Sequence, residues 1–142
     1  MEGGDDMNYW IGVASKDHVN RGVAGGFCQL CHGKSAPLNR MKEGDWLIYY
    51  APKKRFKSKE PCQQFIALGQ ILAGDAYLFE MAPDFVPFRK NVAFVKNSEA
   101  ISLQAVADDP LWQEYRSRLR FGHFQIPKEL FDVISSGMIK AV

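Results

Sequence analysis

The pattern of hydrophobic and polar positions predicts short strands that alternate with short helices. Runs rich in aromatic and β-branched residues predict strands at residues 8–14, 46–51, 63–72, 76–81, 91–95 and 121–126. Ala73-Gly74-Asp75 is a turn signal, so the two runs on either side of it are expected to form a hairpin. Gly69 inside its strand indicates a bulge or a close backbone approach.

Helical segments are expected between these strands. Ser15 is a good N-cap for a first helix that carries Val19 and Val23 on its inward side. Further helical segments are expected at residues 37–42 and 102–106, after Asp109-Pro110, and from Pro127 onward. Residues 25–36 and 52–62 are expected to be loops.

This order of elements predicts an α+β fold. Short connections favour an open β-barrel of about five or six mixed, mostly antiparallel strands with short flanking helices. The 142 residues fit one domain, expected at residues 8–142, with residues 1–7 as a flexible N-terminus. An apolar fraction of 46% and an aromatic fraction of 13% are typical of a well-packed globular protein.

Composition also indicates the compartment. Nothing in the chain approaches the length of a membrane span, and the acidic N-terminus lacks the pattern of a signal peptide. Three cysteines form an odd set, which without an export signal predicts free thiols in a reducing compartment. A cytoplasmic protein with no membrane partner is therefore expected.

The net charge of +2 is unevenly distributed along the chain. One loop concentrates cations that we expect to contact phosphates without reading sequence: Lys53, Lys54, Arg55, Lys57 and Lys59. The alternative is a solvated, mobile loop with no such role. Arg116, Arg118 and Arg120 alternate and would share one face of an extended segment, and Arg118 is a further candidate for phosphate contact.

Cys28-Gln29-Leu30-Cys31-His32 spells the attachment motif of c-type haem. Strands rather than helices follow it, and no export signal precedes it, so we do not expect haem. Zinc would need Cys62 as a fourth ligand, because the second cysteine pair of a typical zinc site is absent. A thioredoxin-type pair would need a helix that begins at Cys28. Reduced loop thiols without a cofactor are the preferred interpretation, and His32 and His123 are expected to make ordinary polar contacts.

Four segments, taken in order, resemble the EVE domain of the PUA-like superfamily. They are Asn8-Tyr9-Trp10-Ile11, residues 37–45 running into Ile48-Tyr49-Tyr50, residues 66–71, and Arg118-Leu119-Arg120-Phe121. The resemblance covers about residues 8–136 and is greatest to small stand-alone bacterial EVE proteins. It implies a PUA-like barrel related to the YTH domains, which read methylated adenosine in RNA. EVE domains are thought to read modified bases, notably modified cytosine in DNA.

The resemblance also implies positions for the site. Phe27-Cys28 matches the YTH position that forms a wall of the base cage, and Ser15 matches the serine that ends the first strand. The YTH asparagines that follow this serine are replaced by Lys16 and Asp17, so methylated adenosine is not expected and the cognate base stays open. Arg120 is placed beside the pocket by its position in the family motif.

These considerations predict a nucleobase pocket. Its expected residues are Trp10, Ser15, Lys16, Phe27, Cys28, Asn39, Tyr49, Tyr50, Arg120 and Phe121. The strand aromatics Trp10, Tyr49 and Tyr50 have core packing as their alternative. No paired carboxylates and no nucleophile–base spacing indicate a reaction, so the protein is not expected to be an enzyme.

The sequence thus predicts a non-enzymatic reader of modified nucleobases in DNA or RNA, taken to be a monomer. Two alternatives remain. One is a metal-binding or redox protein that uses Cys28, Cys31 and His32. The other is a PUA-like module that binds structured RNA.

Overall fold

The structure is a computed structural model in which residues 7–139 are described. Residues 1–6, the larger part of the expected flexible N-terminus, lie outside the described residues, whereas Met7 packs against the core. Within the described part of the chain, no helix combines the length and apolar composition needed to cross a membrane.

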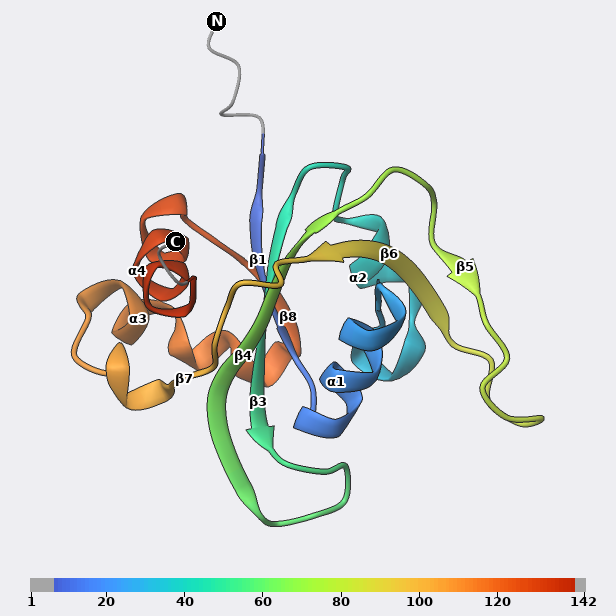
Figure 1. The fold of residues 1–142 in the computed structure, drawn as a ribbon, viewed down its shortest axis with the longest axis horizontal. Coiled ribbons are helices and arrows are strands. Elements are labelled where there is room, and N and C mark those ends of the chain that lie inside the picture. Colours follow the sequence, from blue (N-terminus) through green and yellow to red (C-terminus); the bar gives the residue numbers. More distant parts are fainter. Residues whose placement is uncertain (1–6, 140–142) are drawn as a thin grey trace, which may run out of the picture.

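One curled sheet organises the fold (Figure 1). Its main path runs in the order β2-β6-β4-β3-β1-β8, and β5 and β7 pair with β6 and β4. The bounds of the strands are β1 Tyr9–Val13, β2 Phe27–Cys28, β3 Trp46–Lys53, β4 Pro61–Ile71, β5 Tyr77–Leu78, β6 Phe88–Phe94, β7 Ile101–Ser102 and β8 His123–Ile126. β1 and β3 are parallel, and the other pairs are antiparallel. The expected open barrel of mostly antiparallel strands is therefore confirmed.

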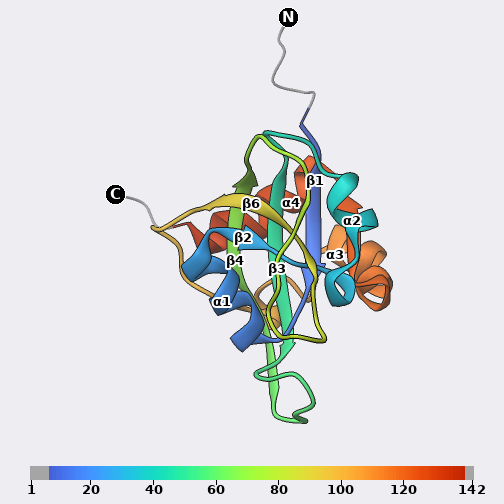
Figure 2. The same ribbon diagram turned by 90° about the vertical axis from the view of Figure 1, so that its right-hand side faces the viewer.

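Short helices flank the sheet on two sides. The α-helices are α1 Lys16–Gly25, α2 Ser35–Asn39, α3 Pro110–Tyr115 and α4 Lys128–Met138, and the 3-10 helices are η2 Cys31–Gly33, η3 Leu103–Ala105 and η4 Arg116–Phe121. α3 and α4 cover one face of the sheet, and α1 and α2 lie over the other (Figures 1 and 2). The expected α+β class is confirmed.

Alternation of side chains along β1 and β3 divides the interior into two clusters. Successive side chains of a strand point to opposite faces of the sheet. Tyr9 and Ile11 accordingly pack toward α3 and α4 together with Trp112, whereas Trp10 packs toward α1 and α2 together with Leu47. Because both faces are covered, these strands are apolar at nearly every position.

Gly69 confirms the expected close backbone approach. A Cβ atom built at this position would lie 2.6 Å from Val92 Cγ1 and 2.9 Å from the Ala93 carbonyl oxygen. The absence of a side chain therefore lets β4 lie directly against β6.

Three local expectations were wrong. β5 pairs with β6 rather than forming a hairpin with β4, because the chain leaves the sheet after β4 and returns beside Arg89. Phe27 and Cys28 lie in β2, inside the segment expected to be a loop, because they pair with Asn91 and Lys90 of β6. Residues 116–121 form η4, so the three arginines of this segment do not share the face of an extended strand.

Candidate functional site

A cavity of about 640 Å³ lies where several segments that are distant in sequence converge. Its walls come from the end of β1, the N-terminal part of α1, the chain around η2, the β3–β4 loop, the segment between β5 and β6, and η4. Small-molecule sites typically occupy about 300–1,000 Å³, so the cavity is large enough for a planar ring system.

The first turn of α1 supplies an acceptor at this cavity. Ser15 occupies the N-cap position, but its hydroxyl donates a hydrogen bond of 2.6 Å to Asp17 Oδ1 instead of capping the helix. The His18 backbone N–H donates to the same oxygen at 2.8 Å. The Ser15 hydrogen bond is the main cause that lowers the pKa of Asp17, so this cavity residue is an ionised acceptor at neutral pH.

His18 lies next to this carboxylate as a neutral ring. Its Nε2 is 3.3 Å from the Gln29 carbonyl oxygen, and since a carbonyl oxygen only accepts, Nε2 carries the hydrogen. Burial lowers the pKa of His18, and the hydrogen bond to Gln29 opposes this only partly. The ring is therefore neutral at pH 7, with Nδ1 as an acceptor.

Gln29 is a buried residue that lines the cavity and contacts several of its neighbours. The Tyr49 hydroxyl lies 3.2 Å from both the Gln29 N–H and its carbonyl oxygen, accepting from the first and donating to the second. Arg89 Nε donates to Gln29 Oε1 at 3.0 Å. The Arg89 guanidinium stacks 3.7 Å from the Phe27 ring centroid and 3.8 Å from that of Phe79. This sandwich holds the side chain of Gln29 at the cavity.

The mouth of the cavity is aromatic. Phe56, Phe85 and Phe121 line it from three separate segments, and Met81 lines it with its sulfur 3.5 Å from Gln29 Nε2. Phe56 is 61% exposed and Phe121 58%, which is unusual for rings of this size. A planar ligand in the cavity would therefore meet apolar ring surface.

Charges around the cavity are predominantly positive. Arg21, Lys53 and Arg120 line it, and Asp17 is the one carboxylate that does so among residues 7–139. Such a site favours a ligand that joins negative charge to a group with hydrogen-bond donors.

The Cys-x-x-Cys-His motif forms a strained turn beside the cavity. Cys31 and His32 both have positive φ, of 49° and 63°, a conformation that costs non-glycine residues of order 1–3 kcal/mol each. The Cys31 thiol lies 3.9 Å from the Phe121 carbonyl oxygen, and the ring of exposed His32 meets Phe56 edge-on at 6.1 Å. The described residues contain no group of three or more His, Cys, Asp or Glu side chains placed to hold a metal ion.

Several predicted pocket residues lie elsewhere. The structure brings Ser15, Arg120 and Phe121 together at the cavity, with Lys53 from the basic loop. The residues buried in the interior instead are Trp10, Phe27, Cys28, Tyr49 and Tyr50. Lys16 and Asn39 lie at the start of α1 and the end of α2 and do not line the cavity.

The interior positions have clear physical causes. The Trp10 indole N–H donates to buried Asp45 at 3.0 Å, so its polar group is satisfied inside the core. Tyr50 packs against the rings of Phe65 and Trp112. Phe27 is 8% exposed because β2 holds it beneath Arg89, so the cage wall that the resemblance implied is not at the cavity.

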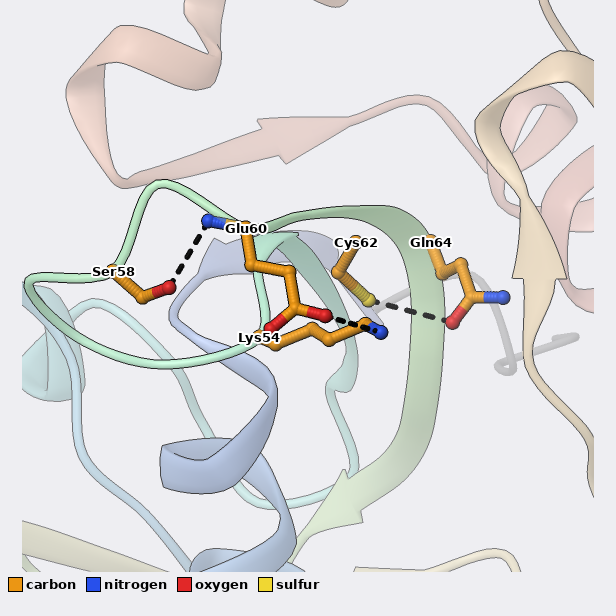
Figure 3. A network of polar contacts seen from close by, with 5 residues as sticks. All are labelled: Lys54, Ser58, Glu60, Cys62 and Gln64. Atoms are coloured by element: carbon orange, nitrogen blue, oxygen red, sulfur yellow. Dashed lines mark hydrogen bonds and ion pairs between the residues drawn. The ribbon is translucent and has the colours of Figure 1, made fainter.

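The basic loop between β3 and β4 is held in shape by its own contacts (Figure 3). Lys54 forms an ion pair of 2.8 Å with Glu60, and the Glu60 N–H donates to the Ser58 hydroxyl at 3.0 Å. The remaining cations Arg55, Lys57 and Lys59 are exposed. Arg118 lies outside this loop and stacks 4.5 Å from the Tyr115 ring centroid.

Residues that sequence reasoning missed complete the site. After its N-cap, α1 contributes Asp17, His18 and Arg21 to the cavity. The sequence signal that could have indicated them was this polar run at the start of an otherwise amphipathic helix. Met81 and Phe85 carry no local signal, because only the fold of the segment between β5 and β6 brings them to the cavity.

Fold and site together define a small α+β domain with a cavity that has aromatic side chains at its mouth and mostly basic charged residues in its lining. The EVE domain family model matches residues 8–137, and the chain belongs to the EVE domain family. The EVE family membership that the resemblance implied is thereby confirmed.

The chain is also similar in sequence to several curated proteins and in fold to several solved structures. A UPF0310 protein of Streptococcus gordonii is 50% identical over 123 residues, which is 87% of each chain. The UPF0310 protein YdcG of Bacillus subtilis is 42% identical over 137 residues, covering 94% of this chain and 93% of the relative. A hypothetical protein from Leishmania major has a TM-score of 0.62 at 12% identity, covering 94% of this chain and 95% of the other. Rpa0253 from Rhodopseudomonas palustris has a TM-score of 0.59 at 19% identity, with 92% of each chain covered.

Proposed function

We propose that this protein is a non-enzymatic reader of modified nucleobases in nucleic acid, with one base held in the cavity. The observation that carries the proposal is the juxtaposition of exposed Phe121 and Phe85, the ionised Asp17 and a basic loop around one cavity of about 640 Å³. The aromatic rings would contact the face of the base, Asp17 its pairing edge, and the basic loop the phosphates.

Ring stacking supplies the first part of the binding energy. Stacking of a base on an aromatic side chain is worth about 1–3 kcal/mol. Phe121 and Phe85 offer such surfaces at the cavity, together with the thioether of Met81. An added methyl group on the base would lie against these apolar atoms.

Asp17 supplies selectivity on the pairing edge of the base. Its Oδ1 is occupied by Ser15 and by the His18 N–H, so Oδ2 is the atom that we assign to the ligand. A carboxylate accepts hydrogen bonds only, which favours a base with an exocyclic amino group such as cytosine. In this proposal Asp17, rather than Phe27, is the residue that recognises the base.

The basic loop supplies affinity without sequence preference. Lys53 lines the cavity, and Arg55, Lys57 and Lys59 extend the cationic surface away from it. Contacts of this kind release counterions from the phosphate backbone, so binding should weaken steeply as salt rises. Ser15 donates to Asp17 rather than to an imidazole, which supports a binding role rather than nucleophilic catalysis.

The test is fluorescence anisotropy at stated salt with single-stranded DNA and RNA that carry one modified or unmodified cytosine. Asp17→Asn keeps the side-chain shape and the oxygen that accepts from Ser15, but replaces the outward oxygen with a donor. We expect it to weaken binding of the preferred strand by about tenfold or more, since hydrogen bonds to charged groups are worth about 1.5–3 kcal/mol.

Asp132→Asn on α4 is the matched control, because Asp132 pairs with Lys128 away from the cavity. It should bind as the parent does. Equal affinity of Asp17→Asn and the parent for every strand would refute the assignment of Asp17. Tighter binding of folded RNA than of any single strand would instead support a module for structured RNA.

A further inference from the structure

Phe56 is an exposed ring at the centre of the basic loop. It is 61% exposed, the largest value among the exposed large hydrophobic side chains described, and it has no place in either core cluster. The Lys53 and Lys57 ammonium groups lie 6.0 Å and 5.9 Å from its centroid. An apolar ring displayed between two cations suits contact with a polyanion that has an apolar interior.

Hydrogen bonds hold the backbone of the loop that carries this ring. Besides the contacts drawn in Figure 3, the Lys54 N–H donates to the Glu60 carbonyl oxygen at 3.1 Å, and the Ser58 N–H donates to that of Arg55 at 3.2 Å. The Asp17 N–H donates to the Lys54 carbonyl oxygen at 3.0 Å. The residue proposed to read the base and the loop that carries Phe56 are therefore tied together.

From this arrangement we infer that the β3–β4 loop inserts Phe56 into a DNA duplex, in the gap left by a base that has moved into the cavity. The inference rests on the proposed function. A base must leave the stack before its pairing edge can be read in a pocket, which costs a few kcal/mol. Apolar side chains such as Phe inserted between base steps unstack and kink the duplex at a similar cost.

Two observations favour this role over simple stacking on the bound base. Phe56 lines the cavity, yet more than half of its surface faces solvent, so it reaches beyond the space that the base would fill. The Lys53 and Lys57 ammonium groups flank the ring at 6.0 Å and 5.9 Å from its centroid, so an inserted ring would bring both cations to the phosphates beside the gap. We assign a DNA duplex, because the major groove of B-form DNA is wide enough for a two-stranded β-ribbon such as the β3–β4 hairpin.

The experiment compares Phe56→Ala with the parent on four probes that share one sequence with a single 5-methylcytosine. These are the DNA single strand, the matched DNA duplex, a DNA duplex with the methylcytosine mismatched, and the matched RNA duplex. A 2-aminopurine next to the methylcytosine reports unstacking. Because Phe56 is exposed, its removal should leave folding intact.

We expect Phe56→Ala to lose about tenfold or more in affinity for the matched DNA duplex, but less than about twofold for the single strand. The loss should be smaller for the mismatched duplex, whose base leaves the stack at lower cost. The parent should raise 2-aminopurine emission, and the variant should not. Phe56→Trp should behave as the parent does, and so should the control Leu78→Ala, which removes a 58% exposed side chain of β5.

Equal losses on single strand and duplex would overturn the inference, since Phe56 would then only stack on the bound base. Unchanged affinity on all probes would overturn it as well, as would an RNA duplex bound as tightly as the DNA duplex. A parent protein that fails to bind the single strand would instead refute the proposed function itself.

Discussion

His123 is expected to make the stability of the protein depend strongly on pH. The side chain is 3% exposed and stacks on Trp10, with ring centroids 4.7 Å apart and planes at 7°. Neither ring nitrogen has a hydrogen-bond partner among the described residues. Burial, with a smaller contribution from Arg40, lowers the pKa of His123 from 6.5 to about 4. The polar contact expected for this residue from the sequence is thus replaced by ring stacking.

The direction of the effect follows from which state binds the proton. Below pH 6.5 the unfolded chain takes up a proton at this histidine, while the folded protein does not do so until about pH 4. The contribution of the buried, neutral His123 to the free energy of unfolding is therefore complete above pH 6.5. It is lost as the pH falls toward about 4. One pKa unit corresponds to about 1.36 kcal/mol, so the whole effect is about 3.4 kcal/mol. About 2 kcal/mol of this contribution is lost between about pH 7.5 and pH 5.0.

His123→Phe removes the titrating group and keeps a ring that can stack on Trp10. Urea unfolding followed by tryptophan fluorescence at both pH values gives the free energy of unfolding of variant and parent. The decrease on acidification should be smaller in the variant by about 2 kcal/mol. His32→Asn, at an exposed position with positive φ that asparagine tolerates, should show the parent's pH dependence. The same decrease in His123→Phe and in the parent would refute the reasoning.

Two further changes test the interior. Asp45→Ala should lower the free energy of unfolding by about 3 kcal/mol, because it removes the acceptor of the buried Trp10 indole N–H and of the partly buried Asn8 and Lys42 backbone N–H groups. Urea unfolding measures this, and an unchanged midpoint would contradict it. Burial raises the pKa of Cys28 to about 12, so iodoacetamide at neutral pH should modify it far more slowly than the half-buried Cys31 and Cys62. Mass spectrometry of timed samples measures the order, and a Cys28 that reacts first would favour the redox alternative.

Elements that depend on local pattern could be predicted from the sequence. Runs rich in aromatic and β-branched residues located β1 and β3, and Asp109 with Pro110 located the start of α3, where Asp109 accepts from the Leu111 N–H at 2.8 Å. A two-residue strand such as β2 could not be located, because it pairs with β6, more than sixty residues further along.

The site was predictable only in part for a similar reason. Ser15, Arg120 and Phe121 were found from motif positions, but the cavity between them exists only when η4 folds beside α1. The role assigned to Phe27 failed because a ring among glycines looks exposed in sequence. Only the structure shows Arg89 and Phe79 stacked over it.

The most direct test of the central claim is to map where a base binds. Isotope-labelled protein is titrated with the single strand that carries 5-methylcytosine, and backbone amide shifts are followed by NMR. We predict that the largest changes fall on His18, Gly33 and Gly122, which line the cavity. The amide signal of Gly137 on α4, which packs against Ile101 and does not line the cavity, should not shift. Shift changes centred on α4, or no shift changes at the cavity when the protein is saturated with the strand, would contradict a base-binding site in the cavity.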